Sequence, residues 1–405
     1  MTDTTARPVT ESVALADLPP WRPPHPSELP EWRTQTREYL ATRTAMLAMA
    51  STINQGQFMM LPTVPGLEGS PGAIASQLLV REERRRLAEA SLYYASADMT
   101  SLALAAATTP PAEPMKESRL PSPYGLMLFA EPIGGYSMTM PTGNTAVTVP
   151  IVAVSWGQWT PRDVSLDRGR VRWLANSSEG PLVIPDAYRG VWLTFYTPDD
   201  ASGYAAMDPG AVVALGPDGT PTTAGELAQA PRTAPLGWDN ELVLAYGAAF
   251  EEPKPDTCDQ WAQTVYTAWQ LMSQGGSRLV DSETVPRPRA GRKRDAREGV
   301  TGSSDVRIVN VHSAHRPTRA AAEQDAAASS GRRAPQYSCR WPVRPHRRDH
   351  CMNPRAHADN GCEHEERIIP PHIKGPEGKP LRVRETVNLW DHQPDGPGTA
   401  AGEGQ

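Results

Sequence analysis

Cysteine and phenylalanine are scarce in this chain, with four of each among 405 residues. So few cysteines exclude the disulfide-dense scaffolds of small secreted domains. No apolar run approaches the ~18 consecutive residues of a membrane-spanning helix. The opening residues, MTDTTARPVTESVALADLPP, lack the basic segment followed by an apolar segment that marks a secretory signal. We therefore expect a cytoplasmic protein that does not associate with a membrane.

Apolar residues make up 39% of the chain, below the average for globular domains, and its 42 prolines are about twice the usual share. The length is sufficient for two or three domains, each with its own core. This composition indicates folded regions separated by Pro-rich segments. Residues 1–28 are the first such segment, and we expect them to form a disordered arm.

The charge of the chain is unevenly distributed. Residues 286–392 hold 21 Lys and Arg against 13 Asp and Glu, whereas residues 1–285 hold 19 against 31. The net charges are therefore +8 and −12, a difference that the overall charge of −6 conceals. The basic part could bind a polyanion, or it could pair with the acidic part of the same chain.

Helical spacing of apolar residues predicts three long helices, over residues 31–57, 80–107 and 257–274. The second contains the charge run REERRR at 81–86, which we interpret as a solvated face with Glu–Arg pairs one turn apart. In the third, Asp256 or Thr257 is expected to cap the first turn.

Short β-branched and apolar runs separated by Gly, Pro, Asn and Asp fill residues 120–250 and predict a mostly antiparallel sheet. We expect Trp156, Trp159, Trp173 and Trp192 to lie in its core or rim. The fold class is therefore α+β: a helix-plus-sheet domain at 29–285, a basic linker at 286–303, a small basic β-module at 304–392 and a disordered tail at 393–405.

Three of the four cysteines and four of the nine histidines lie between residues 337 and 366. A structural zinc ion takes four Cys or His ligands. Cys351, Cys362 and His364, with either His350 or His357, could form such a site and hold one structural zinc. The alternative is a polar loop that is rich in ligating residues but binds no metal.

The same segment has the composition of a nucleic-acid-binding surface. Arginines can bind phosphates and aromatic rings can stack on unpaired bases. The candidate residues for binding are Arg340, Trp341, Arg344, His346, Arg347, Arg348, His372 and Lys374. A solvated or domain-packing surface would have the same composition, so this pattern is generic.

Enzymatic activity is less favoured by the sequence. His346, Arg347, Asp349, His372 and Lys374 are residue types that can perform acid–base chemistry at a phosphodiester. However, the sequence contains no nucleophile elbow, P-loop or HExxH motif. No catalytic residue is assigned.

Several segments together resemble a family encoded by actinobacterial phages, plasmids and chromosomes. They include LYYASADMTSLALAAA and QTVYTAWQLMSQ, then RWPVRPHRR at 340–348, PPHIKGPEGKPL at 370–381 and VNLW at 387–390. The typical ending of that family is RW-x-V-x-GH-W-R followed by PH-x-KGP-x-x-x-PL. This chain departs from it at Pro345, where relatives have Gly, and at Arg347, where they often have Trp.

The ending is also distantly similar to a type V anti-CRISPR-like family, whose members act on nascent peptide or messenger RNA. Arg340, His346, Arg348, His372 and Lys374 match the shared ending. The resemblance implies a mobile-element protein that binds RNA, DNA, a nascent chain or a ribosome-associated partner and acts in phage–host defence or counter-defence. Two alternatives are an interaction protein whose basic module docks on its own acidic domain, and a metal- or His-assisted nuclease.

Overall fold

The computed structural model describes most of the chain. The described residues are 9–12, 21–54, 71–139, 146–161, 164–166, 169–171, 174–177, 180–199, 208–215, 220–230, 234–252, 257–273, 280–297, 306–311, 340–343, 346–352, 364–370, 372–379 and 385–391. The tail expected at 393–405 and Trp173 therefore lie outside the described residues. Within the arm expected at 1–28, Val9–Ser12 forms strand β1 and Pro26–Glu28 forms the 3-10 helix η2.

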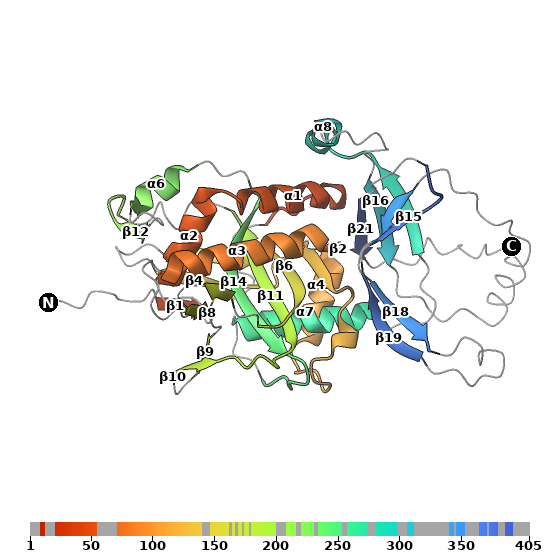
Figure 1. The fold of residues 1–405 in the computed structure, drawn as a ribbon, viewed down its shortest axis with the longest axis horizontal. Helices are drawn as coiled ribbons and strands as arrows, with labels where there is room; N and C mark the ends of the chain where they lie inside the picture. Colours follow the sequence, from red (N-terminus) through yellow and green to blue (C-terminus); the bar gives the residue numbers. More distant parts are fainter. Residues whose placement is uncertain are drawn as a thin grey trace, which may run out of the picture.

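An eight-stranded mixed sheet organises the molecule (Figure 1). Its three parallel pairings, β3 with β2, β2 with β21 and β21 with β16, are consecutive in the middle of the sheet, and the remaining pairings are antiparallel. The predicted α+β class is confirmed. In spatial order the strands are β14 (Leu236–Ala245), β11 (Gly190–Pro198), β6 (Ala153–Trp159), β3 (Tyr124–Phe129), β2 (Ser91–Ala95), β21 (Thr386–Trp390), β16 (Val306–Val311) and β15 (Val280–Val285).

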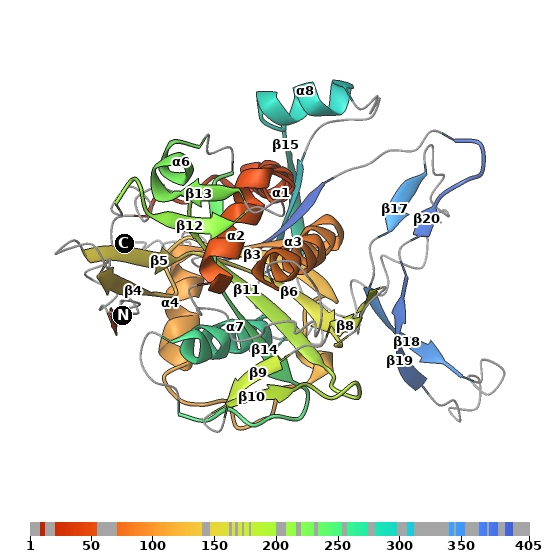
Figure 2. The same ribbon diagram turned by 60° about the vertical axis from the view of Figure 1, so that its left-hand side comes forward.

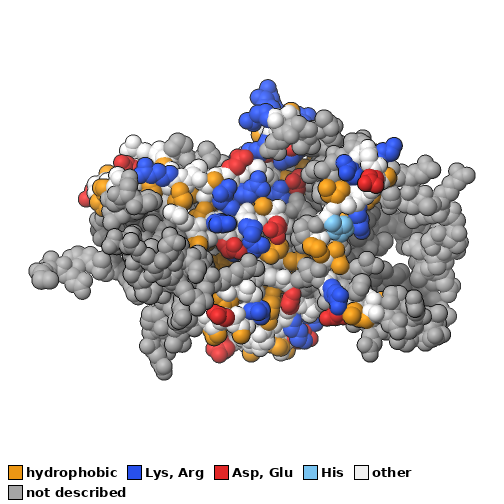
Figure 3. Space-filling model, viewed as in Figure 1, with side chains coloured by type: hydrophobic (Ala, Val, Ile, Leu, Met, Phe, Trp, Pro, Cys, Tyr) orange, Lys and Arg blue, Asp and Glu red, His pale blue; other side chains and the backbone are white. Residues whose placement is uncertain are grey.

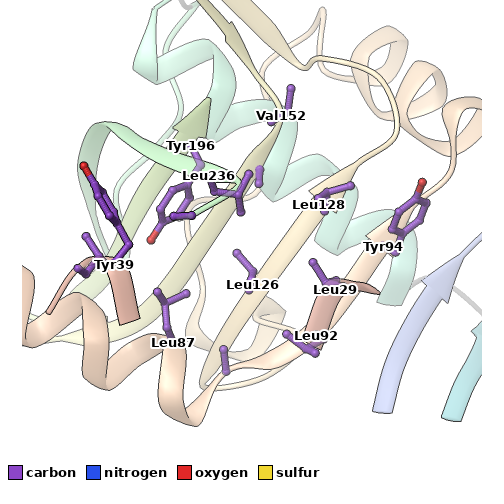
Figure 4. Packing of buried hydrophobic residues seen from close by; sticks show 14 of the residues in the cluster. Leu29, Tyr39, Leu87, Leu92, Tyr94, Leu126, Leu128, Val152, Tyr196 and Leu236 are labelled. Atoms are coloured by element: carbon purple, nitrogen blue, oxygen red, sulfur yellow. The ribbon is translucent and has the colours of Figure 1, made fainter. Parts of the chain in front are cut away.

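Helices cover both faces of this sheet, so each face packs against a hydrophobic core. On one face lie α1 (Leu29–Tyr39), α2 (Arg43–Asn54) and α3 (Pro71–Glu89), whose apolar residues pack with Leu126 and Leu128 of β3 (Figure 4). On the other lie α4 (Ala97–Ala106) and α7 (Cys258–Ser273), which pack with Met127 and Phe129. Figure 2 shows α3 and α7 on opposite sides of the strands.

Smaller elements surround this core. Strand β1 pairs with β4 (Gly134–Thr139), which pairs with β5 (Ala146–Ile151). Two-stranded sheets are formed by β7 (Val164–Leu166) with β8 (Gly169–Val171), by β9 (Leu174–Ser177) with β10 (Gly180–Val183), and by β12 (Val212–Leu215) with β13 (Pro221–Thr223). Two further short helices are α6 (Ala224–Gln229) and the 3-10 helix η3 (Glu117–Arg119).

The helix predicted over residues 80–107 is wrong in its middle. Strand β2 separates α3 from α4, and the Ser96 side chain caps α4 by accepting from the backbone N–H of Met99. Leu92 and Tyr94 pack into one core while Tyr93 and Ala95 pack into the other. Because both faces of this central strand are buried, its sequence shows no polar alternation and cannot be distinguished from a buried helix by periodicity.

The helix predicted over residues 31–57 is divided into α1 and α2. The hydroxyl of Thr42 donates to the carbonyl of Tyr39 at 2.7 Å and accepts from the N–H of Ala45 at 3.2 Å, which ends one helix and caps the next. The predicted helix at 257–274 is confirmed as α7. The predicted core positions of Trp156, Trp159 and Trp192 are also confirmed.

The C-terminal part contributes directly to the main sheet. Strand β21 lies between β2 and β16, so the boundary expected near residues 286–303 falls within one sheet rather than between two. The pairs β17 (Trp341–Val343) with β20 (His372–Lys374) and β18 (His346–Cys351) with β19 (His364–Ile369) form separate ribbons. They stand apart from the main body at the right of Figure 2. Where the sequence predicts a linker, residues Arg289–Arg297 form helix α8.

Candidate nucleic-acid interface

Helix α8 carries its basic residues on one side. Positions 289, 292, 293 and 297 recur at helical spacing, so their side chains share a face. Arg289, Arg292, Lys293 and Arg297 are all exposed, and we call these four residues the α8 stripe. Sequence reasoning missed this stripe because the segment was treated as a linker. The three- and four-residue spacing of its cations was the available signal.

The opposite side of α8 is fixed to helix α1. Arg294 donates to both carboxylate oxygens of Glu31 at 2.7 Å, and its second terminal nitrogen lies 3.1 Å from Glu38. Arg287 donates to Asp295 at 2.8 Å and lies 3.8 Å from Glu31. The inner cations are therefore neutralised by buried carboxylates, and the α8 stripe remains as the charge that α8 presents to solvent.

A second group of exposed cations lies on the outer face of α3. Arg81 and Arg84 are exposed, and Arg85 bridges Glu82 and Glu89 while its guanidinium lies over the Tyr124 ring. In Figure 3, Lys and Arg side chains gather over α8 at the top and over α1 and α3 in the centre of the same face. We call Arg81, Arg84 and Arg85, together with the α8 stripe, the basic face.

The expectation that the whole REERRR run is solvated is wrong for two of its members. Glu83 and Arg86 are buried, with side-chain exposures of 0% and 1%. The Glu83 carboxylate accepts from Arg86 Nε at 2.8 Å, Thr194 at 3.0 Å, Ser155 at 2.5 Å and the Tyr196 hydroxyl. Both carboxylate oxygens have donors, and three of these donors lie on β6 and β11. The network therefore attaches α3 to these strands and holds the outer cations of α3 in place.

A further carboxyl group lies close to this network. Glu241 is buried and accepts from Trp238 Nε1 at 3.2 Å, and its burial raises its pKa to about 8. Asp239 accepts from the Tyr136 hydroxyl at 2.7 Å, and burial raises the pKa of Asp239 to about 6. Burial also raises the pKa of the Cys258 thiol, so this cysteine is not an activated nucleophile.

Four of the eight residues that the sequence proposes for nucleic-acid binding meet on the β17/β20 ribbon. Trp341 pairs with Lys374, and Val343 pairs with His372. Arg340 donates from Nε to the carbonyl of Lys379 at 2.8 Å. Lys374 is exposed, whereas Arg340 and Trp341 are half-buried.

Three of the other candidates belong to a different ribbon. His346, Arg347 and Arg348 belong to β18, which pairs with β19, and Arg344 lies outside the described residues. Successive residues of a strand alternate between its faces, so Arg347 does not share a face with His346 and Arg348.

Three of the proposed metal ligands, His350, Cys351 and His364, fall on the same ribbon. Cys351 is paired directly with His364, whereas His350 is paired with Glu365. Cys362 and His357 lie outside the described residues. Among side chains that the structure describes, no group of three or more His, Cys, Asp and Glu residues is placed to hold a metal ion.

No family model matches the chain, and no curated protein or solved structure is detectably similar to it. In the described part of the chain, no helix is long and apolar enough to cross a membrane. Fold and surface together define an α+β protein with a mixed sheet and a basic face. The resemblance of the C-terminal motifs to proteins of phages and plasmids stays a prediction.

Proposed function

We propose that the protein binds nucleic acid through the basic face, with the α8 stripe as its principal contact. The observation that carries the proposal is the arrangement of α8, which has four exposed cations on one side and neutralising ion pairs on the other. The stripe extends over about 12 Å, at ~1.5 Å per residue, so it can contact more than one phosphate.

The docking of α8 supports this function energetically. A flexible basic linker would lose conformational entropy on binding, whereas cations on a helix that is already ordered lose less. The half-buried Trp341 on the β17/β20 ribbon offers an aromatic face that could stack on an unpaired base. The sequence resemblance adds the proposal that the partner is RNA, DNA or a ribosome-associated nascent chain, in phage–host defence or counter-defence.

The test compares two double variants that remove the same charge. Arg292→Gln with Lys293→Gln removes half of the α8 stripe. Lys116→Gln with Arg189→Gln removes two exposed cations elsewhere. Binding of fluorescent single-stranded RNA, single-stranded DNA and duplex DNA is measured by anisotropy from 50 to 300 mM salt.

The wild type and the Lys116/Arg189 variant are expected to bind with the same steep salt dependence. The Arg292/Lys293 variant should bind about tenfold more weakly or worse, and its slope of log K against log salt should be lower by about 1.5, at ~0.7–0.9 per lost phosphate contact. Equal losses in both variants, or affinity that does not depend on salt, would contradict the proposal.

A second candidate function is internal docking, in which the basic part stabilises the chain by pairing with its acidic part. The ion pair of Arg294 with Glu31, 2.7 Å long, has this polarity and favours internal docking. The pair of Arg33 with Glu385, 2.8 Å long, joins the same two parts with the charges reversed. If docking were the only role, the wild type would bind none of the three nucleic acids, and the Arg292/Lys293 variant would match the wild type in every assay.

A further inference from the structure

The β18/β19 ribbon brings four residues with metal-ligating side chains into two cross-strand pairs, with one further pair between them. Cys351 is paired with His364, and Asp349 is paired with Glu366. These four residues come from two segments separated by residues 352–363, and the antiparallel register alone brings them together. This feature is independent of the basic face.

The register also determines which residues share a face. In an antiparallel pair, residues directly opposite one another lie on the same face, as do residues two apart along a strand. Asp349, Cys351, His364 and Glu366 therefore occupy one face, and His350 with its partner Glu365 occupies the other. The ion pair between Glu365 and Arg367, 2.8 Å long and two residues apart on β19, has the geometry that this alternation requires.

The dimensions of such a face suit a single metal ion. Directly opposite Cβ atoms are about 4.5–5.5 Å apart, and the next pair on the same face is about 7 Å further along. Zinc takes sulfur at ~2.3 Å, imidazole nitrogen at ~2.0–2.1 Å and carboxylate oxygen at ~2.0–2.2 Å. The register therefore places one cysteine, one histidine and two carboxylate residues on a face whose spacing matches a single ion.

We propose that the β18/β19 ribbon binds one zinc ion, with Cys351 and His364 as principal ligands and Asp349 and Glu366 completing the site. A thiolate and an imidazole favour zinc over magnesium or calcium, which prefer oxygen ligands alone. Binding forms a zinc–sulfur bond and releases the thiol proton of Cys351 to solvent, so affinity falls as the pH is lowered. This assignment excludes His350, which the sequence left open as an alternative to His357.

The experiment uses the full chain, purified with a non-thiol reductant, loaded with zinc and desalted before elemental analysis. Cys351→Ser and His364→Ala remove the two principal ligands. The matched controls are His350→Ala, next to Cys351 on the opposite face, and Cys258→Ser, a thiol on α7. Circular dichroism confirms that each variant is folded. Cobalt replaces zinc in a parallel sample because a cobalt–thiolate bond gives a near-ultraviolet absorption band.

We expect about one zinc per chain in the wild type and in both controls, and at least a tenfold loss of affinity in the Cys351 and His364 variants. The cobalt–thiolate band should be absent from Cys351→Ser and present in His350→Ala. Failure of the folded wild type to retain zinc would overturn the proposal. A loss in His350→Ala equal to that in His364→Ala would overturn it as well, because the register would then not determine the ligands.

Discussion

One terminal nitrogen of Arg294 donates to both carboxylate oxygens of Glu31 at 2.7 Å, although the two residues are 263 positions apart. Glu31 is only 5% exposed, so this pair lies beneath α8 rather than at its rim. The relationship links helix α1 to the basic segment that precedes β16. It also explains why the α8 stripe has a fixed orientation.

Removing Arg294 should therefore release α8. We expect Arg294→Ala to lower the free energy of unfolding by about 1–3 kcal/mol, because the buried Glu31 loses its closest charged partner. Arg297→Ala, on the exposed side of the same helix, should change it by less than about 0.5 kcal/mol. Urea denaturation measures both values. Limited trypsin digestion should cleave within 289–297 faster in the Arg294 variant, and equal cleavage of both variants would contradict the docking.

The charge run at 81–86 supplies a second comparison within a single helical turn. Arg86 is buried against Glu83, while Arg85 is exposed. Arg86→Ala should cost about 3–5 kcal/mol, because it leaves the Glu83 charge buried without its partner. Arg85→Ala should cost less than about 1 kcal/mol, since its ion pairs are solvated. Similar midpoints for the two variants in thermal unfolding would show that Arg86 is not part of a buried network.

Glu241 should make the protein less stable as the pH rises. Its pKa is about 8 in the folded state, above its ordinary value of 4.5, because burial disfavours the charged form. Between these pH values the folded state binds more protons than the unfolded state, so the free energy of unfolding falls as pH increases. Asp239, with a pKa of about 6, acts in the same direction up to that pH.

The corresponding variant is Glu241→Gln. The free energy of unfolding of this variant, relative to that of the wild type, should rise by roughly 1–3 kcal/mol between pH 5 and pH 8. This estimate uses ~1.4 kcal/mol per pKa unit. The control is Glu251→Gln, at an exposed position, which should leave the pH profile unchanged. Urea midpoints between pH 5 and 9 provide the measurement. A Glu241→Gln profile parallel to that of the wild type would show that this carboxyl is ionised in the folded state.

The sequence predicts elements whose two sides differ in polarity better than elements buried on all sides. Helix α7 has one apolar stripe between a polar start and two glycines, and the β12/β13 hairpin has a clear turn signal, so both were predictable. Strand β2 was not, because its two faces pack into two cores and its sequence therefore shows no polar alternation. The place of β21 between β2 and β16 depends on pairing across nearly 300 residues, which local patterns do not encode.

The candidate site shows the same limit. Charge composition identifies residues 286–392 as basic, but it cannot separate Arg294, which is neutralised by Glu31, from Arg292, which faces solvent. Likewise, the spacing of ligating residues near residue 350 keeps His350 as a possible ligand beside His364. The register of β18 and β19 separates the two histidines, because it pairs His350 with Glu365 and His364 with Cys351.

The register of β3 and β6 leads to a final prediction. Gly125 is directly opposite Trp156, and a Cβ added at Gly125 would lie 2.0 Å from the indole ring. That ring is fully buried, and it contacts Tyr93 of β2 and Trp269 of α7. The absence of a side chain at Gly125 thus lets Trp156 lie against the sheet and connect it to α7.

Gly125→Ala should displace Trp156 and cost about 2–4 kcal/mol, because overpacking here moves a large ring that is fixed on both sides. Gly237→Ala is the matched control in another strand of the same sheet, since its Cβ would meet only ordinary contacts at 3.5 Å or more. We expect that control to be neutral or to stabilise by up to ~1 kcal/mol. Unfolding by urea and near-ultraviolet circular dichroism test the pair. Unchanged tryptophan signals in Gly125→Ala would show that the ring does not occupy the space above Gly125.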